Sequence, residues 1–126
     1  MATIKSFTDV DQAKVLVDIL PLESADGHWY NGSLGFTYSQ EAKDFYDSVS
    51  NEYLPAWSLS ALLSIIPQEI FDGEYVINIT EGLDNKWIIS YNADNSASFY
   101  GLIASADNLV DACTDIIIKL KERNII

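Results

Sequence analysis

His28 and its neighbours carry the residue types that acid–base catalysis uses. His28 is the only histidine, with Asp26 two residues before it and Trp29 directly after it. A general base needs a second group that orients it, and a nearby carboxylate is a usual choice. The flanking glycines also make this stretch typical of a loop in which a histidine has a surface or packing role. A ligand site or an enzyme active site near His28 is therefore an alternative, not the leading interpretation.

Cys113 is the only cysteine and the only candidate thiol nucleophile. A reactive thiol needs exposure and a positively charged neighbourhood. The spacing of Cys113 to Leu109 and Ile116 places it on the apolar face of a helix, and Asp111 and Asp115 beside it disfavour a thiolate. We interpret Cys113 as a core residue.

The stretch Asn92-x-Asp94-x-Ser96 has the spacing of the first ligands of a calcium loop. Ala97 stands where that loop requires glycine and Ile103 where it requires an acid, so a polar turn is the better interpretation. The sequence has no Cys/His cluster for zinc and no glycine-rich phosphate loop. It therefore predicts no catalytic residue, no metal and no cofactor.

Acidic residues dominate the charge of the chain. Nineteen acids against seven bases give a net charge of −12. Direct binding of nucleic acid needs lysines and arginines against phosphates, and anionic membranes disfavour an acidic protein for the same reason. A basic protein partner and simple solubility both fit the charge. We take as the interaction surface a set of acids spread along the second half of the chain: Asp72, Glu74, Glu81, Asp84, Asp94, Asp111 and Asp115.

The three tryptophans are side chains that either a ligand pocket or a core would use. Trp57 stands in the stretch PAWSLSALLSIIP, just ahead of Leu59 and Leu63. That position suits a ring that lies over a short buried helix and closes one side of the core. The first interpretation is that Trp57 packs in the core, and the second is that it lines a pocket with Trp29 and Trp87.

Length and patterning predict one domain over residues 1–126. No apolar run approaches the roughly 20 residues that span a bilayer. The beginning, MATIKSFTDVDQ, does not have the pattern of a secretory signal, and a single cysteine fits a reducing compartment. We expect a cytoplasmic protein.

Periodicity predicts three helices and a hairpin in the first half of the chain. The expected helices cover 9–20, capped by Thr8, then 40–53, capped by Ser39, and 58–66, capped by a serine at 58 or 60. In the second helix, one face is expected to carry Ala42, Phe45, Tyr46 and Val49. A loose hairpin is expected through 28–38.

The second half of the chain is predicted to form three strands and a helix. Residues 74–80, 86–92 and 97–103 are rich in β-branched and aromatic residues and are separated by turn residues, which predicts an antiparallel meander. A helix capped by Ser105 or Asp107 then runs to about Arg123, with acids early and bases late as the helix dipole favours. The predicted fold is α+β: N-terminal helices, a three-stranded antiparallel meander and a C-terminal helix packed on the sheet.

Three stretches also carry a resemblance to other sequences. LVDILPLESADGHWY, PAWSLSALLSIIP and SADNLVDACTDIIIKLKE, in this order, resemble a group of small uncharacterised proteins encoded by phages and integrated mobile elements of gut bacteria. The resemblance implies an accessory protein of a mobile element in a bacterial cytoplasm. It implies no catalytic residue.

Three functions follow from these observations. The leading hypothesis is a protein–protein interaction module with an unidentified protein partner, for which a basic protein is one candidate. The alternatives are a DNA mimic that inhibits a basic host protein, and a small-ligand-binding protein or enzyme with a site near His28. The oligomeric state is open, because an edge of the meander and the apolar end Ile125–Ile126 are both available for contacts between copies.

Overall fold

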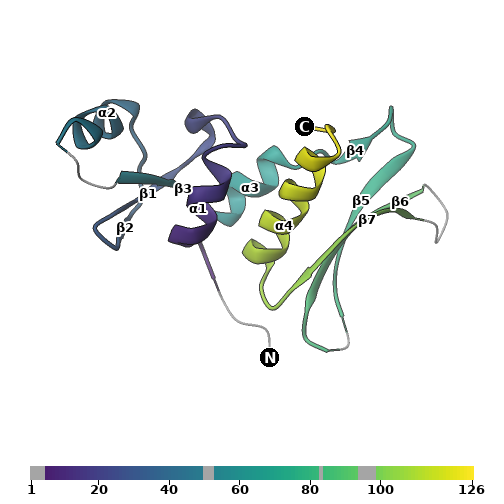
Figure 1. The fold of residues 1–126 in the computed structure, drawn as a ribbon. Coiled ribbons are helices and arrows are strands. Elements are labelled where there is room, and N and C mark those ends of the chain that lie inside the picture. Colours follow the sequence, from purple (N-terminus) through teal and green to yellow (C-terminus); the bar gives the residue numbers. More distant parts are fainter. Residues whose placement is uncertain (1–4, 50–52, 83, 94–98) are drawn as a thin grey trace.

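The computed structural model describes residues 5–49, 53–82, 84–93 and 99–126 and has two antiparallel sheets separated by helices (Figure 1). The first sheet has the order β2-β1-β3 and the second the order β4-β5-β6-β7. Helices α1, α3 and α4 lie between the two sheets, and α2 lies at the far end of the first sheet (Figure 1). The elements are α1 (Val10–Leu16), a 3-10 turn (Leu22–Ser24), β1 (Gly27–Tyr30), β2 (Ser33–Gly35), α2 (Gln40–Ser48), β3 (Tyr53–Ala56), α3 (Leu59–Ile65), β4 (Glu69–Ile70), β5 (Tyr75–Glu81), β6 (Trp87–Ala93), β7 (Phe99–Ala106) and α4 (Leu109–Glu122). The predicted α+β class is confirmed.

Helix α1 is shorter than predicted and begins with a different cap. The Asp9 side chain accepts a hydrogen bond from the Gln12 amide at 2.8 Å, and the Gln12 side chain accepts one from the Asp9 amide at 3.0 Å. This reciprocal capping box fixes the start of the helix. Thr8, the predicted cap, is fully buried, and its hydroxyl accepts a hydrogen bond from the Trp57 amide. The helix ends at Leu16, and a turn leads on to Pro21.

The predicted hairpin is present as β1 and β2, but a third strand that was not predicted completes this sheet. β3 pairs with β1 in the register Tyr30↔Tyr53 and His28↔Pro55. The predicted helix over 40–53 therefore ends earlier, at Ser48, and Tyr53 belongs to a strand. Pro55 is tolerated because β3 is an edge strand, where an amide donor is not needed on the free side.

The meander is confirmed, with each strand displaced by one to three residues toward the C-terminus. β5, β6 and β7 are successive antiparallel neighbours, and the short strand β4 extends the sheet beyond β5. Ile77 lies opposite Tyr91 and Ile79 opposite Ile89, as expected for a common inner layer. Residues 97 and 98 of the third predicted strand lie outside the described residues.

Helix α4 packs on the inner face of this sheet and supplies much of the core. Asn108 caps it by accepting a hydrogen bond from the Asp111 amide at 2.8 Å, so neither Ser105 nor Asp107 is the cap. Cys113 is fully buried, as predicted. Trp57 is also fully buried within the same core, and its indole N–H donates to the Ser24 hydroxyl at 2.9 Å. Packing, the first interpretation of Trp57, is confirmed.

Candidate interaction surface

The first sheet has a helix on each face. Trp29 lies opposite Leu54 in the register of β1 and β3, and its indole N–H donates to the Thr8 carbonyl just ahead of α1, at 2.8 Å. Because side chains alternate along a strand, His28 and Tyr30 point to the other face. That face is the one that α2 covers.

Five aromatic rings fill the space between this face and α2, and we call them the aromatic cluster. Tyr46 of α2 stacks on Tyr53 at 5.3 Å between ring centroids and contacts Tyr30 at 4.3 Å. His28 stacks on Tyr53 at 4.8 Å, and Tyr38 completes the group 5.7 Å from Tyr53. Aromatic pairs of this kind contribute about 0.5–1.5 kcal/mol each beyond the area that they bury. The cluster therefore holds α2, which has no fully buried residue of its own, against the sheet.

His28 takes part in this packing and is not paired with Asp26. Its ring lies directly over Gly35, where an added Cβ would come within 2.2 Å of the imidazole. Nδ1 of His28 contacts the carbonyl oxygen of Thr37. The two carboxylate oxygens of Asp26 instead accept hydrogen bonds from the amide and the hydroxyl of Ser58, the cap of α3. The sequence proximity of Asp26 and His28 does not produce a catalytic pair.

The apolar face predicted for α2 is divided between the sheet and solvent. Ala42 and Tyr46 are half-buried, whereas Phe45 is 61% exposed and Val49, one turn further on, is 48% exposed. Glu41 lies one turn before Phe45 on the same side of the helix. A charged residue on that side of the helix is the sequence signal that Phe45 and Val49 face water. The prediction placed Ala42, Phe45, Tyr46 and Val49 on one face and did not use this signal.

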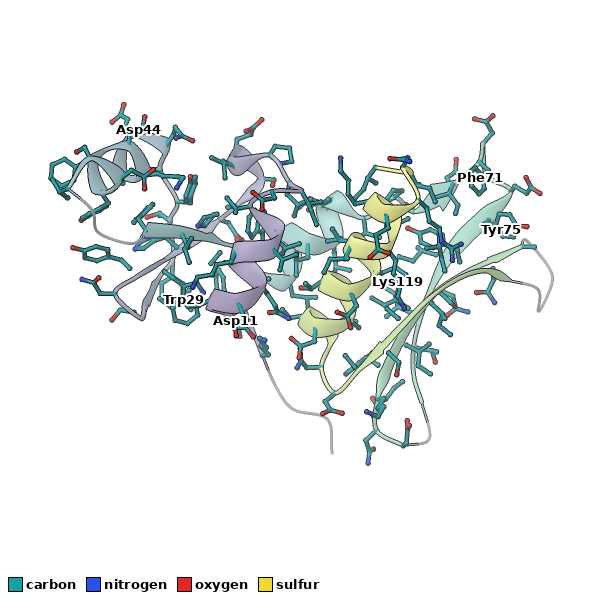
Figure 2. The ribbon with its side chains drawn as sticks, in the orientation of Figure 1. Asp11, Trp29, Asp44, Phe71, Tyr75 and Lys119 are labelled. Carbon is teal, nitrogen blue, oxygen red and sulfur yellow. The ribbon has the colours of Figure 1, made fainter. Side chains whose placement is uncertain are left out.

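Acidic side chains flank the exposed apolar pair. Asp44 precedes Phe45, is exposed, and points away from the sheet (Figure 2). Glu41 is exposed as well. The one base of this helix, Lys43, pairs with Asp47 at 3.2 Å. We call Glu41, Asp44, Phe45 and Val49 the α2 surface.

The acids predicted as the interaction surface do not gather in one place. Asp72 and Glu74 lie in the turn between β4 and β5, and both are exposed. Glu81 and Asp84 lie at the other end of β5, also exposed. A seven-residue strand separates the two pairs by roughly 20 Å. Asp94 lies outside the described residues.

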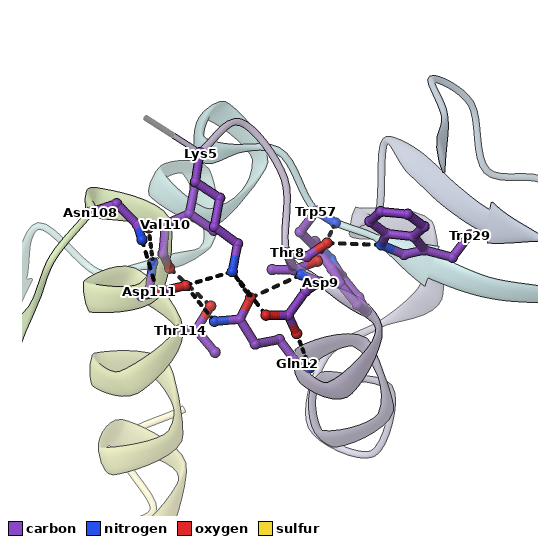
Figure 3. Close-up of polar contacts among 10 residues, drawn as sticks. All are labelled: Lys5, Thr8, Asp9, Gln12, Trp29, Trp57, Asn108, Val110, Asp111 and Thr114. Carbon is purple, nitrogen blue, oxygen red and sulfur yellow. Dashed lines mark hydrogen bonds and ion pairs between the residues drawn. The ribbon is translucent and has the colours of Figure 1, made fainter. Parts of the chain in front are cut away.

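Asp111 has a structural role (Figure 3). One of its carboxylate oxygens accepts hydrogen bonds from Lys5 Nζ at 2.8 Å and from Gln12 Nε2 at 2.7 Å, and the other accepts from Asn108 Nδ2 at 2.8 Å. Lys5 Nζ also donates to Asp9 at 2.9 Å, so the group joins the starts of α1 and α4. Burial alone would raise the pKa of the Asp111 carboxyl, but the hydrogen bonds from Lys5, Gln12 and Asn108 outweigh it and the pKa is lowered.

Asp115, one turn after Asp111 on α4, is exposed. Desolvation and then the charge of Asp111 raise the pKa of its carboxyl. Asp115 is therefore the only predicted acid on α4 that is open to a partner.

Neither a reactive thiol nor a metal-binding cluster is found in the part of the chain that the structure describes. Burial raises the pKa of Cys113 to about 12, which keeps the thiol protonated at neutral pH. Open hollows are also present among the described residues. One, of about 460 Å³, lies between the 3-10 turn and α3 and is lined by Ser24, Asp26, Ser60, Ala61, Ser64 and Ile65. Another, of about 380 Å³, lies between β4 and the end of α4, beside Phe71 and Arg123.

No family model matches this sequence, and neither a curated protein nor a solved structure is significantly similar to it. Within the described ranges, no helix combines the length and the apolar character needed to cross a membrane.

Proposed function

We propose that this chain is a protein-interaction module and that the α2 surface docks into an apolar groove with a basic rim on another protein. The observation that carries the proposal is the exposure of Phe45 in α2 and of Val49, the residue that caps the end of α2, with acids beside them. Amphipathic helices bind partner grooves through apolar residues at this spacing. Aromatic residues also contribute more than most others to the energy of such interfaces.

The charge of the α2 surface indicates what kind of partner it would bind. Glu41 and Asp44 lie next to the apolar pair, and the chain as a whole carries −12. Lysines or arginines at the rim of the partner's groove would complement these carboxylates and speed association at low salt. As part of the same proposal, the resemblance to proteins of phages and mobile elements favours a partner in a bacterial cytoplasm.

The test compares three forms of the tagged, full-length protein in binding from a bacterial lysate at low and at high salt. The wild type is expected to retain a basic protein that high salt releases. The double variant Phe45→Ala/Val49→Ser is expected to lose at least about tenfold in affinity for it, because truncation of an interface aromatic costs roughly 1–2 kcal/mol or more. Both side chains are exposed, so the variant should still fold.

Val15→Ser is the matched control. Val15 is 46% exposed on α1, close to the 48% of Val49, but lies outside the α2 surface. Equal retention of the partner by the control and the wild type, with loss only in the double variant, supports the proposal. Retention by the double variant at wild-type affinity contradicts it.

A further inference from the structure

β7 is a long free edge of the second sheet. Within the described residues its only strand neighbour is β6, and it runs for eight residues from Phe99 to Ala106. The opposite edge, β4, has only two residues. A free edge presents a row of unpaired amide and carbonyl groups that can accept another strand. β7 is thus the edge of this sheet with the length to do so.

The contacts of β7 show which of its backbone groups point outward. Ile103 lies opposite Ser90 of β6, and Lys119 Nζ, between α4 and β7, donates to the Ile103 carbonyl (Figure 2). That carbonyl therefore points away from β6. Because antiparallel strands alternate, the backbone groups of Ser105 point outward as well. The register of β7 on β6 shifts between the pairs Ser90–Ile103 and Asn92–Phe99, so the regular alternation covers Ile103 to Ala106. The carbonyl of Ile103 keeps a second lone pair, and Lys119 is an exposed side chain that can move aside.

The two rows of outer-face residues that end at this edge carry no charge. Two rows cross β5, β6 and β7: one is Asn78, Ser90 and Ile103, and the other is Thr80, Ile88 and Ser105. Ile103, at the edge, is 40% exposed. Two copies of a chain with a charge of −12 repel each other, so they can approach most closely where acids are missing. This edge fits a second copy of the chain better than it fits a basic partner.

We propose that two copies pair through β7, antiparallel and about a twofold axis at Ile103, so that their two four-stranded sheets become one continuous sheet. This register sets Ile103 against Ile103 of the second copy and Gly101 against Ser105. It pairs the outward amide and carbonyl of Ile103 in each copy with those of the other copy. The two isoleucine side chains meet at the centre of the junction, where cross-strand β-branched pairs are favourable.

Self-association through β7 does not depend on the proposed function of the α2 surface. The effect of added salt distinguishes the two proposals. Added salt screens repulsion between two acidic copies and should strengthen the dimer. The same salt should weaken docking of the α2 surface on a basic partner. Either result can therefore fail without the other.

Disulfide trapping tests the register. Paired strands place opposite Cα atoms about 5.5 Å apart, within the range that a disulfide spans. Under mild oxidation Ile103→Cys is expected to form a covalent dimer. Val76→Cys is the control, because Val76 is equally exposed at 40% on the same sheet face but belongs to β5. The native thiol, Cys113, is fully buried and should not interfere. Faster trapping at position 76 than at 103 would mean that the sheets meet face to face and would overturn the proposal.

Sedimentation equilibrium of the unmodified chain, with and without added salt, tests the dimer itself. The expected result is a monomer–dimer equilibrium whose dissociation constant rises at least about tenfold in Ser105→Pro and stays unchanged in Ser105→Thr. Proline removes an outward amide and blocks the edge without breaking a bond to β6. A monomer at all concentrations, or a dimer that Ser105→Pro leaves intact, would refute pairing through β7. Circular dichroism of both variants confirms that they are folded.

Discussion

Replacement of Lys5 by methionine tests how the starts of α1 and α4 are held together. The Lys5 ammonium contacts Asp9 at 2.9 Å and Asp111 at 2.8 Å, and its side chain is 24% exposed. Partly exposed ion pairs contribute about 0.5–1 kcal/mol each, and the variant also leaves two carboxylates facing each other without a cation. We expect Lys5→Met to lower the free energy of unfolding by about 1–2 kcal/mol at neutral pH.

The pH dependence of this loss follows from the two carboxyl groups. Burial raises the pKa of Asp9, but hydrogen bonds from Gln12 and Lys5 outweigh it, so the pKa lies below its ordinary value of 3.8, as does that of Asp111. A carboxyl whose pKa is lowered by folding stabilises the protein above its unfolded pKa and loses that contribution as the pH falls through the folded pKa. The difference in unfolding free energy between wild type and Lys5→Met should therefore have its full value at pH 7. It should shrink toward zero as both carboxyls become protonated.

Urea unfolding followed by tryptophan fluorescence at a series of pH values measures this difference. Lys121→Met is the control, because it changes the net charge equally at an exposed position in the last turn of α4. We expect it to cost about 0.5 kcal/mol or less. A Lys5→Met loss no larger than that of the control, or one that stays constant into acid, would refute the role assigned to the Lys5 contacts.

Three further predictions concern the core and the aromatic cluster. Trp57→Phe should lower the unfolding free energy by about 2–3 kcal/mol in urea titrations, because it leaves a cavity and removes the hydrogen bond to Ser24. Gly35→Ala should lower the melting temperature by the equivalent of about 1–3 kcal/mol, because the new Cβ collides with the His28 ring; an unchanged melting temperature would show that the ring moves freely. Cys113 should not react with a thiol reagent at pH 8 until denaturant is added, because its pKa is about 12, and rapid reaction of the native protein would contradict its burial.

Local signals predicted the second half of the chain well. The meander follows from β-branched runs separated by polar turns, and α4 follows from its apolar period and its charge order. The caps were displaced because several polar residues stand next to each other at these helix starts. At α1 the Thr8 hydroxyl is taken by the Trp57 amide, a contact that sequence spacing does not reveal, and Asp9 caps the helix instead. At α4 Asn108 caps through the Asp111 amide three residues on, a local spacing that the prediction overlooked.

Long-range pairing explains the errors in the first half. β3 pairs with β1 across more than twenty residues, and Pro55 within it reads locally as a chain break. The candidate site was missed for a related reason. Acid content along the chain drew attention to residues that the fold places at opposite ends of β5, whereas the exposure of Phe45 and Val49 depends on how much of α2 the aromatic cluster covers.

Photo-crosslinking from position 45 tests the interaction proposal most directly. A photoreactive phenylalanine analogue replaces Phe45 in one form of the protein and Val15, exposed to a similar degree as Val49, in a second. On irradiation in bacterial lysate, position 45 is expected to give one dominant covalent product with a basic protein, position 15 to give none, and high salt to abolish the product. Equal products from both positions, or none from position 45, would contradict the assignment of the α2 surface as the docking site.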